Sequence, residues 1–119
     1  MAKKFLICDD EEGVRESLKL VLENQYSLII TESGTQCLDC LAHAKDVAIV
    51  FLDIKMPQIN GLDILKEIKQ RHPHIKVIMI TGYKSVETAG EAVRRGASGY
   101  ITKPFKSEDV LASIARNLK

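Results

Sequence analysis

The sequence has 119 residues and a mass of 13.3 kDa, a length that predicts one domain over residues 1–119 and leaves no room for two. Leu, Ile, Val and Phe occupy 36 positions, which excludes a disordered chain. The net charge of +1 argues against general binding to nucleic acid or anionic membranes. The longest apolar run, residues 47–52, is too short to span a bilayer, and no signal-peptide pattern opens the chain. We therefore expect a cytoplasmic protein.

Short apolar runs alternate with stretches of helical periodicity along the chain. The runs predict strands over residues 5–8, 27–31, 47–52, 77–80 and 99–102. Helical patterns lie at residues 14–22, 34–44, 64–68, 85–95 and from 107 onward. The run at 47–52 shows no alternation, which indicates a strand covered on both faces at the sheet centre. This order predicts an α/β fold in which helices cover both faces of a parallel sheet.

The last two helices differ in the apolar faces that they are expected to bury. The helix at 85–95 offers only Val86, Ala89 and Val93, so we expect thin packing and low local stability. The final helix is expected to bury a fuller face, consisting of Val110, Leu111, Ile114 and Leu118.

Three cysteines, an odd number, argue against a disulfide framework. The spacing Cys37-x-x-Cys40-x-x-His43 is compatible with a metal site by residue type. On a helix, however, Cys37 and His43 point roughly 120° apart, so the three side chains do not converge on one ion. We interpret them as small or half-buried helix residues.

Polar side chains follow four of the predicted strands. In a parallel sheet, ligands bind beyond the carboxyl ends of the strands, where we expect Asp9, Asp10, Asp53, Thr81 and Lys103 to meet. Carboxylates gathered in one crevice repel each other unless a cation neutralises them. Oxygen ligands without nearby nitrogen or sulfur favour Mg²⁺ or Mn²⁺ over zinc.

A phosphoryl group is the natural ligand of such a site, because Mg²⁺ usually keeps phosphate oxygens in its shell. Lys103 can neutralise phosphoryl oxygens, the Thr81 hydroxyl can donate a hydrogen bond to one, and a carboxylate can attack phosphorus. Each residue alone is more often a turn, cap or surface residue. Their joint occurrence at successive strand ends favours the functional interpretation.

Together these residues closely resemble the receiver domain of two-component response regulators over the whole chain. The matching segments are Asp9-Asp10, Asp53-Ile54-Lys55-Met56-Pro57 with Gly61, Thr81-Gly82 and Lys103-Pro104-Phe105. The resemblance implies a doubly wound, flavodoxin-like sheet of five strands in the order 2-1-3-4-5 with five helices.

The resemblance also implies how the site is used. Asp53 would accept a phosphoryl group from a phosphohistidine. Mg²⁺ or Mn²⁺ would be bound by Asp10, Asp53 and the backbone carbonyl of Lys55, with Asp9 acting through water. The chain would then catalyse its own phosphorylation and dephosphorylation without being a conventional enzyme.

Further residues take roles by the same resemblance. Lys103 would contact the phosphoryl group, and its peptide bond to Pro104 is expected to be cis. Thr81 would turn toward the new phosphate, and Tyr100 would rotate inward as the switch aromatic. The readout surface would be the fourth helix, fifth strand and fifth helix.

The implied partners are a sensor histidine kinase or a histidine phosphotransfer protein, and an output domain or target protein. The stretch from Ile80 to Ala89 resembles receivers of bacterial transcription activators, which predicts a role in transcription regulation. No helix-turn-helix or dense basic face predicts direct nucleic-acid binding. A homodimer through the last helices stays open. Lys55 and Tyr83, which flank the expected pocket, are predicted to slow hydrolysis of the phosphoryl group.

Several other functions are possible for a chain of this fold. The chain could instead be a stand-alone phosphorelay intermediate or single-domain regulator. A flavin-binding protein of this fold is disfavoured because the acidic loop at residues 9–12 would repel a flavin phosphate. A phosphatase with an aspartyl intermediate is disfavoured because no Asp-x-Asp follows the first strand. A degenerate receiver is disfavoured by the intact acid, Thr and Lys set.

Overall fold

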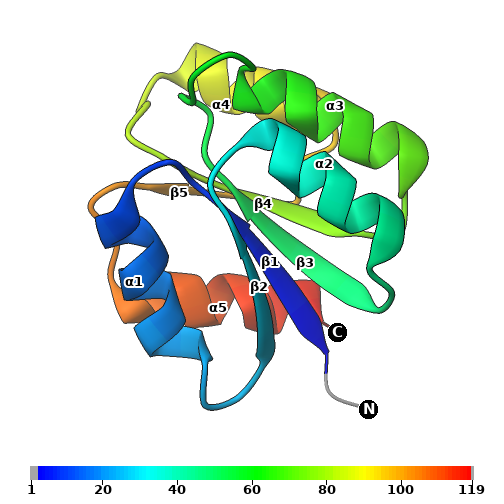
Figure 1. Cartoon of the computed structure of the whole chain (residues 1–119). Helices are drawn as coiled ribbons and strands as arrows, with labels where there is room; N and C mark the ends of the chain where they lie inside the picture. Colours follow the sequence, from blue (N-terminus) through cyan, green and yellow to red (C-terminus); the bar gives the residue numbers. More distant parts are fainter. Residues whose placement is uncertain (1–2, 119) are drawn as a thin grey trace.

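The computed structural model describes residues 3–118, which form a five-stranded sheet between two layers of helices (Figure 1). The strands are β1 (Lys4–Cys8), β2 (Ser27–Thr31), β3 (Val47–Leu52), β4 (Lys76–Thr81) and β5 (Gly99–Thr102). The helices are α1 (Glu12–Leu22), α2 (Gly34–His43), α3 (Gly61–Arg71), α4 (Val86–Arg94) and α5 (Ser107–Asn117). No helix within residues 3–118 is long and apolar enough to cross a membrane.

All neighbouring strands pair in parallel, in the order β2-β1-β3-β4-β5. The predicted fold and strand order are therefore confirmed. Strand β3, the run without alternation, occupies the centre of the sheet. Nearly all of its side chains are buried, whichever face of the sheet they lie on. Parallel pairing brings the carboxyl ends of all five strands to one edge of the sheet.

Each face of the sheet has its own apolar core. Helices α1 and α5 cover one face, and α2, α3 and α4 cover the other (Figure 1). The apolar residues of the helical patterns at 14–22 and 64–68 supply α1 and α3 with their buried faces, which include Leu18, Leu22, Ile64, Leu65 and Ile68. Side-chain oxygens cap three helices: Ser33 for α2, Asn60 for α3 and Ser85 for α4.

The expected inner face of α4 is wrong for its two valines, whereas Ala89 is half-buried. Val86 and Val93 are 87% and 63% exposed, and Ala92 is the residue that this helix buries. The helix is rotated so that its two valines face away from the sheet. In α5, Leu111 is likewise exposed rather than buried, whereas Val110 lies in the core as predicted.

Ion pairs accompany the thin apolar packing of α4. The guanidinium of Arg95, at the end of α4, lies 2.9 Å from an Asp63 carboxylate oxygen on α3 and 2.7 Å from one of Glu91. Helix α4 is therefore held against α3 partly by the ion pair between Arg95 and Asp63, which screening by water weakens.

The cysteine and histidine residues of α2 do not converge. Cys37 is fully buried, Cys40 is half-buried, and the His43 side chain is exposed at the end of the helix. The three side chains therefore point in different directions, which agrees with the interpretation of these residues as small or half-buried helix residues.

Gly61, the first residue of α3, lies against the backbone that carries Asp53. Its amide N–H donates to the Ile54 carbonyl oxygen at 2.7 Å. A methyl group at Gly61 would lie 2.0 Å from the Asp53 carbonyl oxygen and 2.6 Å from the Ile54 α-carbon. Both obstacles are backbone atoms, so any side chain here must displace the segment that follows β3.

We predict that Gly61→Ala lowers the free energy of unfolding by about 1–3 kcal/mol, because overpacking against backbone forces a shift. Chemical denaturation measures the loss. Gly13→Ala is the matched control: it lies in the first turn of α1, nothing lies within 4 Å of its added methyl, and it should be neutral or slightly stabilising. Equal stabilities for the two variants would contradict this account.

Candidate functional site

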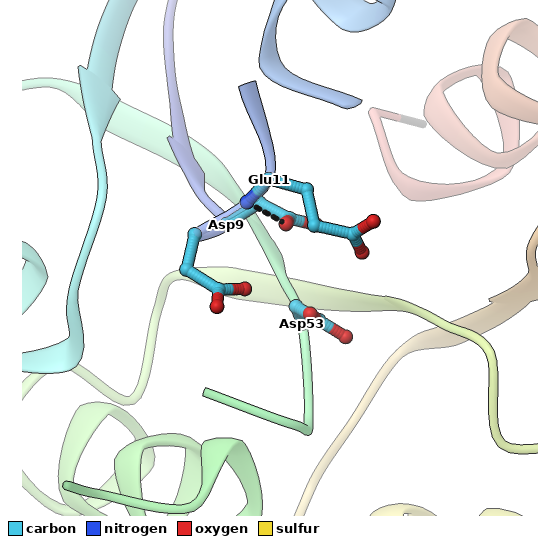
Figure 2. Close-up of side chains that lie close together, drawn as sticks. Asp9, Glu11 and Asp53 are labelled. Carbon is cyan, nitrogen blue, oxygen red and sulfur yellow. Dashed lines mark hydrogen bonds between the residues drawn. The ribbon is translucent and has the colours of Figure 1, made fainter. Parts of the chain in front are cut away.

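The register of β1 and β3 brings two aspartates together. Cys8 and Leu52, the last residues of these strands, are paired, so Asp9 and Asp53 leave the sheet side by side. The Asp53 amide donates to the Cys8 carbonyl oxygen at 3.1 Å. Carboxylate oxygens of Asp9, Asp10, Glu11 and Asp53 all lie within 4.8 Å of one another. Figure 2 shows Asp9 and Glu11, joined by a hydrogen bond, beside Asp53.

Strands β4 and β5 bring Thr81 and Lys103 to the same edge. Thr81 pairs with Thr102, and the Lys103 amide donates to the Thr81 carbonyl oxygen at 2.8 Å. The peptide bond between Lys103 and Pro104 is cis, as expected. The sequence-predicted residues of four separate strand ends are thus gathered in one place.

The ammonium group of Lys103 lies among three carboxylates. Its Nζ is 2.6 Å from Glu11 Oε1, 3.0 Å from Asp9 Oδ2 and 3.4 Å from Asp53 Oδ2. Burial alone would lower the pKa of Lys103, but hydrogen bonds to Glu11 and Asp9 outweigh it and raise that pKa. Lys103 therefore stays charged.

One ammonium does not neutralise the cluster. Burial raises the pKa of Asp9 to about 6, although the Glu11 N–H donates to Asp9 Oδ1 at 2.9 Å and opposes the shift. Burial also raises the pKa of Asp53, which Lys103 and the Thr81 hydroxyl partly offset. With four clustered carboxylates and one ammonium, the ionised site carries excess negative charge, which a cation would relieve.

The donor set of this cluster suits a hard divalent cation. All four candidate ligands are carboxylates, and Mg²⁺ and Mn²⁺ prefer oxygen, whereas zinc prefers nitrogen and sulfur. Asp10 is exposed and open to a hydrated ion, whereas Asp9 and Asp53 are buried.

An open cleft of about 600 Å³ adjoins the cluster. Its lining consists of Asp10, Glu11, Asp53, Lys55, Thr81, Gly82, Tyr83 and Lys103. The cleft therefore gives a ligand access to the buried Asp53 carboxylate, with Lys55 and Tyr83 on its rim as the sequence analysis expected.

Tyr100 stands apart from the carboxylates but contacts the cleft wall. Its half-buried side chain donates a hydrogen bond from the hydroxyl to the Tyr83 carbonyl oxygen at 2.8 Å. The Tyr83 amide in turn lies 3.4 Å from the Thr81 hydroxyl oxygen. A short chain of contacts thus links β5 to the end of β4.

Glu11 is the site residue that the sequence analysis missed. Along the chain it is only one of the four acids in the loop 9–12. Its side chain crosses to Lys103, 92 residues away, with the shortest of the three Lys103 contacts. The available signal was its place directly after Asp9-Asp10, but chain position alone does not say which way a side chain points.

We predict that Asp9→Asn is more stable than the wild type at pH 7.5 in EDTA, by up to about 3 kcal/mol. The unfolded carboxyl has a pKa of 3.8 and the folded one a pKa of about 6, so the native state binds more protons between these values. Wild-type stability therefore falls as pH rises from about 4 to about 6.

Denaturation at several pH values measures this difference, which should shrink toward pH 4 as wild-type Asp9 becomes protonated. The neighbouring exposed variant Asp10→Asn serves as the control and should show a smaller change. An Asp9→Asn protein less stable than the wild type at pH 7.5 would show that the Lys103 contact outweighs burial.

Comparison with known proteins places the site in context. Residues 5–115 match the family described as the response regulator receiver domain. The response regulator FleR of Pseudomonas aeruginosa is 34% identical over 118 residues, covering 98% of this chain and 25% of FleR. The DNA-binding transcriptional regulator NtrC of Klebsiella pneumoniae is 37% identical, covering 92% of this chain and 24% of NtrC. The chain thus spans about a quarter of these relatives.

Solved structures agree with the sequence comparisons. A CheY-like receiver domain protein from Methanospirillum hungatei superposes with a TM-score of 0.92 and 31% identity, covering 98% of this chain and 93% of the other. The BeF3-activated receiver domain of DrrB gives a TM-score of 0.91 at 27% identity, covering 99% and 98%. The acidic cluster is typical of the metal site of receivers. The chain belongs to the response regulator receiver domain family.

Proposed function

We propose that this receiver is a phosphorylation-dependent signalling switch in which Asp53 accepts the phosphoryl group. The observation that carries the proposal is the position of Asp53, whose buried carboxylate opens onto the cleft and faces the Lys103 ammonium at 3.4 Å. The family implies a kinase partner. The donor would be a phosphohistidine on a sensor histidine kinase or a histidine phosphotransfer protein.

In the proposed reaction, an Asp53 carboxylate oxygen forms a bond to phosphorus as the bond from phosphorus to the imidazole nitrogen breaks. The imidazole leaves and takes up a proton. Lys103 neutralises charge on the phosphoryl oxygens, and Thr81 donates a hydrogen bond to one of them. Water then hydrolyses the aspartyl phosphate, which releases inorganic phosphate and restores the Asp53 carboxylate. By family the chain is not a conventional enzyme, and it would catalyse only its own modification.

Asp10, Asp53 and the backbone carbonyl of Lys55 would hold Mg²⁺ or Mn²⁺, with Asp9 acting through water. The excess negative charge of the carboxylate cluster supports this assignment, because Lys103 alone leaves the pKa of both Asp9 and Asp53 raised. Bound Mg²⁺ would supply charge stabilisation to the transferring phosphoryl group.

The proposed output is a shift of the surface formed by α4, β5 and α5. Helix α4 buries one alanine and exposes Val86 and Val93, so it can move at low cost and offers apolar area to a partner. Thr81 and Tyr100 would link phosphorylation to that movement. Because FleR and NtrC are regulators, we propose that the target is an output domain or partner protein in transcription regulation.

Phosphorylation with acetyl phosphate and Mg²⁺, followed by intact-protein mass spectrometry, tests the acceptor. The wild type should gain one phosphoryl group, EDTA should abolish the gain, and Asp53→Asn should fall to background because an amide is a poor nucleophile. Asp39→Asn, an exposed acid on α2, is the control and should behave as the wild type. An Asp53→Asn protein that still takes up phosphate would remove Asp53 from the proposal.

Amide hydrogen exchange of α4, with and without phosphorylation, tests the switch aromatic. We expect phosphorylation to change exchange in the wild type, and Tyr100→Ala to lose most of that change because no ring is left to move. Tyr100→Phe keeps the ring and removes the hydrogen bond to Tyr83, so it separates the two contributions. An unaltered response in Tyr100→Ala would exclude Tyr100 as the switch.

A further inference from the structure

The Lys103 ammonium is held most closely by a residue other than the proposed acceptor. Glu11 lies at 2.6 Å, whereas Asp53 is the most distant of the three carboxylate partners at 3.4 Å. The three partners also differ in exposure. The Glu11 side chain is 60% exposed, compared with 3% for Asp9 and 4% for Asp53.

An ammonium group has three N–H donors, and here three carboxylates surround it. A phosphoryl oxygen on Asp53 would therefore compete for Lys103 with carboxylates that already hold its ammonium group. Exposed ion pairs contribute little to stability because water and salt screen them. The exposed Glu11 contact is therefore the least costly of the three to break.

The position of Glu11 is fixed relative to the site. Its backbone N–H donates to Asp9 Oδ1 at 2.9 Å, at the residue that immediately precedes α1. Its side chain is free of this bond and reaches Lys103, which follows β5. The contact therefore spans the edge of the cleft between two segments that are distant in sequence.

We propose that Glu11 is a positioning residue that holds Lys103 in the unphosphorylated state and competes with the phosphoryl group for its ammonium. This inference rests on the proposed function, since it sets how readily Asp53 is phosphorylated. Glu11 itself does not touch the reacting atoms. Glu11→Gln removes the charge and keeps the shape, so the contact with Lys103 weakens to a hydrogen bond with a neutral amide oxygen, and the contacts with Asp9 and Asp53 stay in place.

The first test compares Glu11→Gln with Glu12→Gln. Glu12 is the next residue, is exposed, and has the same charge, but it makes no contact with Lys103 within the described residues. The second-order rate constant for phosphorylation by acetyl phosphate is measured at saturating Mg²⁺, so that a change in metal affinity does not contribute. We expect Glu11→Gln to raise it about two- to fivefold, the range for release from one exposed ion pair.

Glu12→Gln reports the general effect of one fewer negative charge on an anionic donor. We expect its effect to be smaller than that of Glu11→Gln, and to disappear at high salt, where exposed charges are screened. Equal effects of the two substitutions would overturn the inference. They would show that any acidic residue near the site has the same effect through its charge, without a contact to Lys103.

The second test asks whether the effect passes through Lys103. In a Lys103→Met background, Glu11→Gln should leave the slower rate constant unchanged, because no ammonium is left to release. The NMR signal of the Lys103 side chain in the unphosphorylated protein should shift in Glu11→Gln and stay in place in Glu12→Gln. This spectroscopic measurement needs no phosphodonor.

The outcomes separate this inference from the proposed function. A wild-type chain that takes up no phosphate would overturn the proposed function and this inference with it. A wild-type chain that is phosphorylated, with a Glu11→Gln effect that persists without Lys103 or with an unshifted Lys103 signal, would overturn the role of Glu11 alone.

Discussion

The parallel pairing of β1, β3, β4 and β5 is the constraint on which the site depends. Because all these strands run in one direction, their last residues lie at one edge of the sheet. The polar residues that follow the strands therefore lie together at that edge, beyond the apolar cores. Four carboxylates thereby gather at this edge, and three of them share the ammonium group of Lys103. Burying the Asp9 and Asp53 carboxylates is unfavourable in free energy, and the apolar burial in the two cores of the sheet offsets it.

This arrangement makes the site responsive to added charge. Burial raises the pKa of Asp9 and Asp53 because desolvation disfavours their charged forms, and a bound cation would stabilise those forms. Lys103 is shared rather than committed to one carboxylate. A new anionic group on Asp53 would redistribute the contacts of Lys103. Thr81 is linked to Lys103 by the backbone hydrogen bond between the ends of β4 and β5.

Helix α4 shows how packing and function are connected in this fold. Its two valines face outward, and the ion pair of Arg95 with Asp63 contributes to its attachment to α3. The sequence analysis assigned Val86 and Val93 to the core because a helical apolar pattern normally marks the buried face. Here that pattern marks an exposed surface, although the periodicity is the same in both cases. Only the neighbours of the helix distinguish them.

Sequence alone determined the order of strands and helices, the central position of β3 and the residues at the strand ends, because burial and chain direction are written in local patterns. Asp9, Asp53, Thr81 and Lys103 were found for this reason. The rotation of α4, the exposed position of Leu111 and the contact of Glu11 with Lys103 were decided by tertiary structure. Each depends on which groups from distant segments surround a side chain, and the spacing of residues along the chain carries no such information.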